Sequence, residues 1–191
     1  MSVAAVNASA KINVVRTEVN GVLILEPKVF GDARGFFMET YNKATMAEVG
    51  ITDNFVQDNH SRSEHNVLRG LHYQVEQTQG KLVRAIVGEL FDVAIDLRRS
   101  SPTFGKWAAA TLSAENKRMM WVPAGCAHGF LVVSDIAEVL YKATDFYAPQ
   151  HERSIRWDDP DLQIEWPIVA PPLLSDKDRN GLKFAEAPLF E

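Results

Sequence analysis

Residues 80–97 read GKLVRAIVGELFDVAIDL, in which two short and largely apolar runs are separated by Gly88. In the second run, Asp92 and Asp96 alternate with apolar residues, so a strand here has one apolar and one acidic face. Acidic faces of this kind are usually solvated, and we expect the same of these two aspartates. Both runs have the length and pattern of β-strands.

Similar runs, broken by Gly, Pro, Asn or Asp, follow one another along the chain after Arg16. They predict strands at 21–27, 36–41, 54–61, 66–74, 80–87, 89–97, 107–112, 118–122, 128–133, 137–143 and 155–157. Many short strands at this spacing are typical of an all-β sandwich or barrel. Two short peripheral helices are expected, one over 42–49 and one that begins near Ser175. The proline-rich stretch 167–172 predicts a rigid connection that carries the C-terminal segment back over the β domain.

The length and composition predict a single domain. The chain has 191 residues, of which 46% are hydrophobic and 24% charged, enough for one sizeable core. We expect a loose tail over 1–13, a core over about 14–178 and a C-terminal segment over 179–191. The tail lacks the charged and apolar regions of a signal peptide, and no apolar run approaches the roughly 18 residues of a membrane span. A cytoplasmic location is therefore expected.

Charge and cysteine content exclude several classes of partner and site. The formal net charge is -5, which argues against broad contact with nucleic acid or anionic lipid, so a phosphate partner needs a local pocket. Cys126 is the sole cysteine, which excludes an intrachain disulfide and a Cys-based zinc site. The five histidines form no His-x-His pair, although scattered ligands leave a metal-dependent barrel as an alternative.

Residues 67–74, VLRGLHYQ, contain a conflict of strand parity. In a regular strand Arg69 and His72 point to opposite faces. If both serve one pocket, the strand must break register, and Gly70 between them is a common marker of a bulge or of close backbone approach. The alternative is a surface Arg69 opposite a buried His72, and the spacing does not decide between the two.

His72 is a candidate for proton transfer, because histidine has the side-chain pKa nearest neutrality. A hydrogen-bonded core histidine is the more common role in general. Arg69, Gln74 and Lys81 concentrate polar groups around His72, which favours a pocket. Lys81 opens an apolar strand, so its ammonium either reaches solvent or points into that pocket.

Other candidates have ordinary structural explanations. Asp178 completes Ser175-Asp176-Lys177-Asp178, the Ser-x-x-Asp form of a capping box, and only a tertiary contact could make it the partner of a histidine. Tyrosines such as Tyr141 and Tyr147 usually pack in strands with the hydroxyl at the rim. His128 lies in a glycine-flanked turn, where a histidine is more often a hydrogen-bonding prop than a reactive group.

A resemblance covers about residues 22–178 and rests on many short motifs in a fixed order. They are FGDARGFF at 30–37, FVQDNHS at 55–61, VLRGLHYQ at 67–74, QGKLVR at 79–84, SPTFG at 101–105, AHGF at 127–130, LYKAT at 140–144 and LSDKD at 174–178. Each motif is weak alone, but their order and density are highly specific. Together they are similar to the dTDP-4-dehydrorhamnose 3,5-epimerase family.

This resemblance implies a metal-free, cupin-type β jelly roll that needs no cofactor. It also implies a homodimer whose N-terminal strands cross between subunits, and a dTDP-sugar substrate with a 4-keto group. The ketone acidifies the protons on C3 and C5 by accepting charge as an enolate. Epimerisation then requires a base on one face of the ring, stabilisation of the enolate oxygen, and an acid on the opposite face.

The resemblance also assigns roles to individual residues. His72 is implied as the base, Asp178 as its orienting carboxylate, Lys81 as the cation near the 4-keto oxygen and Tyr141 as the acid. The positions implied to bind nucleotide, diphosphate or sugar are Phe30, Arg34, Glu39, Gln57, Asn59, Arg69, His128 and Tyr147. No metal ligand is implied.

Three alternatives remain at this point. The chain could epimerise one carbon only, because single-carbon relatives can carry the same base, lysine and tyrosine. It could be an inert cupin that binds a sugar nucleotide, although binding alone needs no acid and base on opposite faces. It could also be a metal-dependent cupin oxygenase or isomerase.

Overall fold

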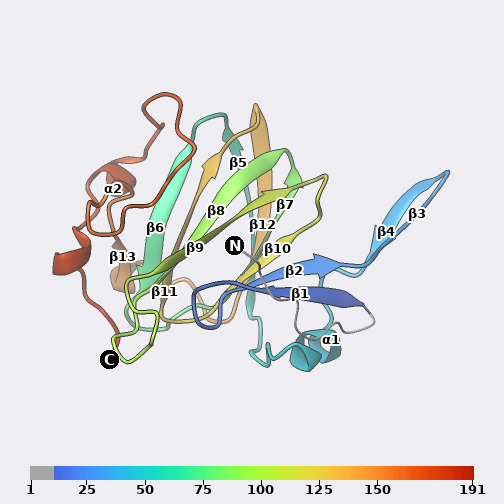
Figure 1. Cartoon of the computed structure of the whole chain (residues 1–191), viewed down its shortest axis with the longest axis horizontal. Coiled ribbons are helices and arrows are strands. Elements are labelled where there is room, and N and C mark those ends of the chain that lie inside the picture. Colours follow the sequence, from blue (N-terminus) through green and yellow to red (C-terminus); the bar gives the residue numbers. More distant parts are fainter. Residues whose placement is uncertain (1–10) are drawn as a thin grey trace.

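The computed structural model describes residues 11–191 and contains two antiparallel β-sheets that face each other (Figure 1). The six-stranded sheet has the order β1-β2-β10-β7-β12-β5, and the five-stranded sheet has the order β13-β6-β11-β8-β9. The strands of the first are β1 (Ile12–Arg16), β2 (Leu23–Pro27), β10 (Met119–Val122), β7 (Lys81–Val87), β12 (Ile136–Ala143) and β5 (Gln57–Glu64). Those of the second are β13 (Glu152–Ser154), β6 (Leu68–Gln74), β11 (Cys126–Val132), β8 (Glu89–Asp96) and β9 (Trp107–Ser113). With its few short helices, this arrangement confirms the predicted all-β jelly roll.

The two runs of residues 80–97 form β7 and β8, which belong to different sheets. Gly88 carries the chain from one sheet to the other with a φ of +69°, a conformation that favours glycine. A Cβ atom at this position would lie 1.8 Å from the carbonyl oxygen of Ile136. Any other residue would therefore displace the backbone at this crossing.

The space between the sheets is apolar over most of its length. Val83 and Ala85 of β7 face Leu90 and Ala94 of β8 within one buried cluster. Burial of such side chains contributes about 25 cal/mol per Å² of apolar surface removed from water. This core holds the two sheets at a fixed separation.

The pairing of β6 with β11 is irregular between Arg69 and His72. Such a break was expected if these two side chains share a pocket, because in a regular strand they point to opposite faces. On β11, His128 pairs with His72 and Phe130 pairs with Arg69. These partners are two residues apart on β11 but three apart on β6, so β6 contains one extra residue here. Gly70 lies at the irregularity with a φ of +127°, and a Cβ there would lie 2.5 Å from Gly129 Cα. The close approach of two backbones therefore requires glycine at position 70.

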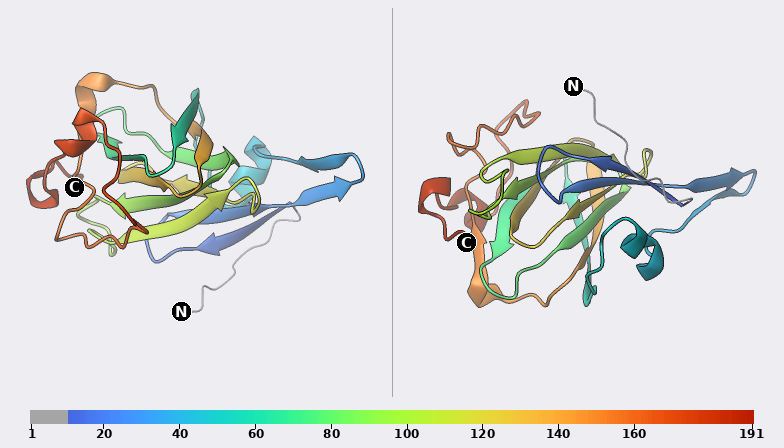
Figure 2. Two further views of the ribbon diagram at one scale, coloured as in Figure 1. Left: turned by 90° about the horizontal axis from the view of Figure 1, so that it is seen from above. Right: turned by 60° about the horizontal axis from the view of Figure 1, so that its bottom comes forward.

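A two-stranded ribbon, β3 (Val29–Asp32) paired with β4 (Gly35–Met38), projects away from the sheets (Figures 1 and 2). Its aromatic side chains are exposed, with Phe30 at 55%, Phe36 at 59% and Phe37 at 70%. The first strand of this ribbon was missed by the sequence analysis. Four-residue strands around a turn leave little periodic signal to recognise.

The two predicted helices are present. α1 (Lys43–Glu48) is capped by the Asn42 side chain, which accepts hydrogen bonds from two backbone N–H groups, and α2 (Asp176–Arg179) is capped by Ser175. The chain after α2 returns over the five-stranded sheet (Figure 2). There Phe184 and Phe190 pack against another buried cluster, which includes Leu71 of β6 and Val93 of β8. Single 3-10 turns lie at Pro149–His151 and Phe184–Glu186.

Several boundaries differ from the expectations. β1 begins at Ile12, which pairs with Pro27, so residues 12 and 13 belong to the sheet and not to the expected tail. Residues 1–10 of that tail lie outside the described residues. Two expected strands are displaced, because β5 is 57–64 and the last strand is 152–154. Within residues 11–191, no helix has the length and hydropathy of a membrane span.

The acidic face expected of residues 89–97 is not solvated. Asp92 and Asp96 are both 0% exposed, so that expectation is wrong. The alternation is real, but both faces of β8 are covered, one by the facing sheet and the other by the C-terminal segment. Local pattern cannot distinguish a polar buried face from a polar solvated one.

Candidate active site

A pocket of about 360 Å³ opens between the two sheets, at the edge formed by β5, β6 and β13. This volume lies near the lower end of the range for small-molecule sites, about 300–1,000 Å³. Its lining residues are Gln57, Asn59, Ser61, Arg69, His72, Gln79, Lys81, His128, Gly129, Phe130, Tyr141, Tyr147, Glu152 and Lys177. The pocket is therefore the polar continuation of the apolar space between the sheets.

His72 lies on β6, and its imidazole forms a hydrogen bond with the carboxylate of Asp178 on α2. The distance from His72 Nε2 to Asp178 Oδ1 is 2.5 Å, and the Asp178 side chain is 4% exposed. Asp178 also accepts the Ser175 hydroxyl proton at 2.6 Å, while its backbone N–H donates to Ser175 Oγ. The capping box and the tertiary contact thus coexist, and the cap orients the carboxylate toward the histidine.

Burial lowers the pKa of His72, with further lowering by the charges of Lys177 and Lys81 and an opposing increase from Asp178. Burial by itself raises the pKa of Asp178, but hydrogen bonds from His72, Ser175 and the Gly70 backbone lower it overall. His72 is consequently neutral and Asp178 ionised near neutral pH. A neutral imidazole held in one tautomer by a carboxylate is suited to act as a base.

Lys81 enters the pocket from β7 of the opposite sheet. Its Nζ has no hydrogen-bond or ion-pair partner among residues 11–191 that would neutralise the charge directly. Burial lowers its pKa to about 8, while the charges of Glu152 and Asp92 raise it and Lys177 lowers it further. The ammonium is therefore the main form at pH 7 and is available to a developing negative charge.

Tyr141 lies beside Lys81 on the same sheet. Its strand β12 pairs with β7 so that Tyr141 is opposite Val83 and Ala143 is opposite Lys81, which makes Tyr141 and Lys81 diagonal neighbours on one face. Burial raises the pKa of the Tyr141 phenol, partly offset by the charge of Arg69. A phenol that stays protonated at neutral pH can donate a proton.

Three further candidates from the sequence also line the pocket. The register break turns Arg69 toward it, and Arg69 Nε donates to Ser63 Oγ at 3.0 Å. Gln57 Nε2 donates to Asn59 Oδ1 at 2.9 Å. Asn59 Nδ2 is buried without a hydrogen-bond partner in the described part of the chain. A buried donor without a partner in a pocket is suited to binding a polar ligand group.

His128 contributes a second histidine–carboxylate pair. His128 Nε2 lies 2.8 Å from Asp92 Oδ1, and these side chains are 9% and 0% exposed. His128 is the direct partner of His72 in the pairing of β6 with β11. The two imidazoles therefore lie next to each other on one sheet, and each forms a hydrogen bond with a buried aspartate.

Two charged residues of the pocket, Glu152 and Lys177, were not among the candidates from the sequence. Glu152 of β13 accepts the Tyr147 hydroxyl proton at 3.0 Å and pairs with Lys177 at 2.8 Å. Burial raises the pKa of Glu152, but the Lys177 hydrogen bond and charge lower it overall. Lys177 lies in the motif that contains Asp178 and could have been suspected from it, whereas the neighbours of Glu152 in sequence contain no comparable signal.

The structure does not bring Phe30, Arg34 or Glu39 to this pocket. Phe30 and Arg34 lie on the projecting ribbon, where Arg34 pairs with Asp32 at 2.6 Å, and they line a separate surface hollow. Glu39 accepts hydrogen bonds from Thr45 at 3.0 Å and Asn42 at 3.1 Å near α1. Within one chain these residues do not meet His72.

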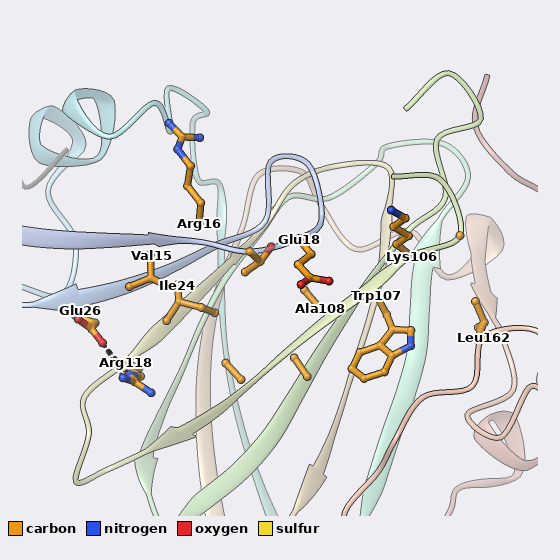
Figure 3. A pocket seen from close by; sticks show the side chains of 14 residues that line it. Val15, Arg16, Glu18, Ile24, Glu26, Lys106, Trp107, Ala108, Arg118 and Leu162 are labelled. Atoms are coloured by element: carbon orange, nitrogen blue, oxygen red, sulfur yellow. Dashed lines mark hydrogen bonds and ion pairs between the residues drawn. The ribbon is translucent and has the colours of Figure 1, made fainter. Parts of the chain in front are cut away.

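A larger hollow of about 860 Å³ lies between β1, β2 and β9 (Figure 3). It is lined by apolar side chains such as Val15, Ile24 and Trp107, and its charged groups include the ion pair of Arg118 with Glu26 at 2.9 Å. It contains no histidine and none of the residues that the sequence singled out. Titratable groups with shifted pKa values converge in the smaller pocket, which is therefore the candidate active site.

No group of three or more His, Cys, Asp or Glu side chains in residues 11–191 is arranged to hold a metal ion.

Comparisons with known proteins agree on one family. A sequence profile described as dTDP-4-dehydrorhamnose 3,5-epimerase matches residues 16–186. A dTDP-4-dehydrorhamnose 3,5-epimerase of Pseudomonas aeruginosa is 62% identical over 176 residues, which span 92% of this chain and 97% of that protein.

Two solved structures are similar along most of the chain. The dTDP-6-deoxy-D-glucose-3,5-epimerase of Legionella pneumophila, in complex with dTDP-4-keto-L-rhamnose, has a TM-score of 0.92 and 49% identity, covering 94% of this chain and 98% of that one. ChmJ of Streptomyces bikiniensis, a 3'-monoepimerase in complex with dTDP-quinovose, has a TM-score of 0.83 and 33% identity, covering 88% and 86%.

Proposed function

The chain belongs to the dTDP-4-dehydrorhamnose 3,5-epimerase family, and is an isomerase. We propose that it converts dTDP-4-dehydro-6-deoxy-D-glucose to dTDP-4-dehydro-L-rhamnose by inverting C3 and C5, in the biosynthesis of dTDP-L-rhamnose. The observation that carries the proposal is the His72–Asp178 pair at 2.5 Å, which faces Lys81 and Tyr141 across one pocket. In the proposed steps these side chains provide the base with its orienting carboxylate, the cation for the enolate, and the acid.

The base in this proposal is His72, acting through Nδ1. Asp178 occupies Nε2 and so holds the proton there, which leaves the Nδ1 lone pair for the substrate. Nδ1 takes the proton from C3 or C5, the C–H electron pair becomes the C=C bond of the enolate, and the C4=O pair moves to oxygen. Asp178 stabilises the resulting imidazolium, which afterwards returns its proton to solvent.

Lys81 is placed to stabilise the enolate. Within residues 11–191 its ammonium has no partner that would compete for the developing oxyanion, and its buried surroundings strengthen the attraction. His128 and Arg69 line the same pocket and are proposed to bind the sugar.

Tyr141 is the proposed acid. His72 extends from the five-stranded sheet and Tyr141 from the six-stranded sheet, so a ring bound between them presents opposite faces to the two groups. The phenol gives its proton to the carbon on the face away from His72, which inverts the centre, and regains a proton from solvent. The facing sheets thus account for inversion by side chains alone.

The nucleotide part of the substrate is proposed to bind across a homodimer. A pocket of about 360 Å³ suits a sugar ring and leaves the nucleoside diphosphate outside. The ribbon β3–β4, which carries Phe30 and Arg34, projects away from the sheets (Figure 2). It exposes three phenylalanines, which is typical of an interaction surface. In the proposed dimer it reaches the second subunit, where Phe30 stacks near the base and Arg34 binds the diphosphate. Glu39, Gln57, Asn59 and Tyr147 complete the proposed substrate contacts.

The extent of epimerisation is supported by sequence identity. Identity is 62% to the Pseudomonas aeruginosa 3,5-epimerase and 33% to the 3'-monoepimerase ChmJ. We therefore favour inversion at both carbons over inversion at one. The experiment is incubation with the 4-keto sugar nucleotide in deuterium oxide, with NMR detection of exchange and inversion at each carbon. Exchange and inversion at both C3 and C5 are expected; inversion confined to one carbon would overturn the double epimerisation, and no exchange would overturn the activity.

A further inference from the structure

Asp92 is a buried carboxylate that the proposed steps do not use. It lies on β8 between Leu90 and Ala94, on the face that packs against the opposite sheet, and is 0% exposed. Its Oδ1 accepts a hydrogen bond from His128 Nε2 at 2.8 Å. Its Oδ2 is buried and has no hydrogen-bond partner among residues 11–191. An incompletely bonded buried carboxylate is costly to the fold and requires an explanation.

The second buried aspartate of the same strand differs in this respect. Asp96 is also 0% exposed, but its carboxylate is bound by Arg98 at 2.8 Å, Ser101 at 2.5 Å and Thr103 at 2.7 Å. Asp96 therefore clamps the chain after β8 in an ordinary structural role. Among the described residues, Asp92 is bound by His128 alone and by no arginine, so structural clamping does not explain its free oxygen.

Asp92 is one of two carboxylates whose charge raises the pKa of Lys81. Lys81 enters from β7 of the facing sheet and lacks a direct partner in the described part of the chain. The negative charges of Glu152 and Asp92 support its own charge. The other charged or titratable groups that face it in the pocket are His72, Arg69, His128, Tyr141, Tyr147 and Lys177. Of the two supporting carboxylates, Glu152 is already bound to Lys177 and Tyr147, whereas Asp92 has an unbound oxygen.

We propose that Asp92 is a positioning residue of the active site, whose buried negative charge keeps the Lys81 ammonium protonated while its hydrogen bond holds His128 at the pocket wall. Asp92 does not line the pocket but bonds to His128, which does, so it acts through Lys81 and His128. A carboxylate that does not line the pocket favours the ammonium without pairing with it directly. The Nζ protons of Lys81 therefore stay available to the enolate oxygen.

The proposal is tested by titrating Lys81 directly. The ¹³Cε resonance of Lys81, assigned by its loss in Lys81→Arg, reports the protonation of Nζ in the intact protein without substrate. The wild-type midpoint is expected near the pKa of about 8. In Asp92→Asn the midpoint is expected to fall by about one unit, a tenfold change in the protonation equilibrium. Asn retains an oxygen that accepts from His128, so the hydrogen bond is preserved.

Matched variants separate charge from structure. Asp96→Asn makes the same substitution on the same strand; it is expected to lower thermal stability and to leave the Lys81 midpoint unchanged. Asp92→Glu keeps the charge and is expected to restore most of the wild-type midpoint. If Asp92→Asn does not fold, Asp92→Ser is the second neutral variant. A wild-type Lys81 midpoint in either neutral variant would overturn the proposal.

The kinetic consequence rests on the proposed function. In Asp92→Asn the alkaline limb of kcat/KM is expected to move to lower pH together with the Lys81 midpoint. A midpoint that moves while the limb does not would contradict the role of Lys81 in the reaction and leave the role of Asp92 intact. The NMR titration therefore tests the role of Asp92, and the kinetic measurement separately tests the role of Lys81 in the proposed reaction.

Discussion

His72 and Asp178 are joined by a contact of 2.5 Å although 106 residues separate them in the chain. The histidine lies on β6, next to the edge strand of the five-stranded sheet, and the aspartate lies in a four-residue helix that is capped by Ser175. The sheet and the cap together fix which imidazole nitrogen faces the pocket.

Removing the carboxylate of Asp178 should impair the base without unfolding the protein. In Asp178→Asn the amide can stabilise the wrong tautomer and cannot stabilise the imidazolium, so kcat is expected to fall by about 10²–10⁴-fold. The control is Ser175→Ala, which removes the cap and its hydrogen bond to Asp178 but keeps the hydrogen bonds that Asp178 accepts from His72 and the Gly70 backbone. It should lower the free energy of unfolding by about 1 kcal/mol with a much smaller effect on kcat. Equal losses of kcat in both variants would contradict the assigned role.

Proton loss and inversion should separate in Tyr141→Phe. The variant keeps the ring and lacks only the hydroxyl that donates the proton, so His72 should still exchange substrate hydrogen with solvent deuterium. Completed inversion is expected to slow by about 10²-fold or more relative to exchange. In contrast, His72→Ala should abolish exchange at both carbons while its circular dichroism stays that of the folded protein. Retained exchange in His72→Ala would remove His72 as the base.

The pH profile of kcat/KM should be bell-shaped. Because burial lowers the pKa of His72 below its ordinary 6.5, activity should rise with pH below that value as the imidazole becomes neutral. It should fall again near pH 8 as Lys81 loses its proton. In Lys81→Arg the cation persists at any working pH, so the alkaline limb should move upward even though the rate is reduced. An unchanged alkaline limb would assign that ionisation to another group.

Two inactive variants should restore activity when combined. Arg34→Ala removes a diphosphate contact proposed to act in the other subunit, while His72→Ala removes the base. A mixed dimer then has one intact site, and about a quarter of all sites should be active after random reassociation. Refolding from denaturant as a mixture, followed by assay, measures this. Absence of rescue, with dimers present by light scattering, would indicate that each ribbon serves its own chain.

Gly70 should tolerate no side chain. In Gly70→Ala the Cβ would meet Gly129 Cα at 2.5 Å, and φ is +127°, so the free energy of unfolding should fall by about 3 kcal/mol or more. Gly50→Ala is the matched control, since φ is +90° but no atom lies within 4 Å of the added Cβ. It should cost about 1 kcal/mol. Similar losses in chemical denaturation would argue that the φ angle alone, and not the contact with β11, requires glycine at position 70.

Local sequence pattern predicted most of the strands and drew attention to Arg69, His72 and Lys81 in the pocket. The alternation of short apolar runs predicted the all-β fold, and the glycine between Arg69 and His72 indicated the register break. These features depend on near neighbours in the chain, because side-chain direction alternates along a strand and glycine alone accepts certain backbone angles. The resemblance of the motifs added the family and the residues of the pocket.

Only the tertiary structure showed which side chains the carboxylates of Asp178 and Asp92 contact. Asp178 matched a capping box and proved to be both the cap and the partner of His72, while Asp92 matched a solvated face and proved to be buried. Glu152 had no signal, and Phe30 and Arg34 lie far from the pocket that their motif suggested. Contacts between distant residues depend on how the sheets and the C-terminal segment pack. That packing follows from the summed burial of the whole chain, which no short stretch of sequence contains.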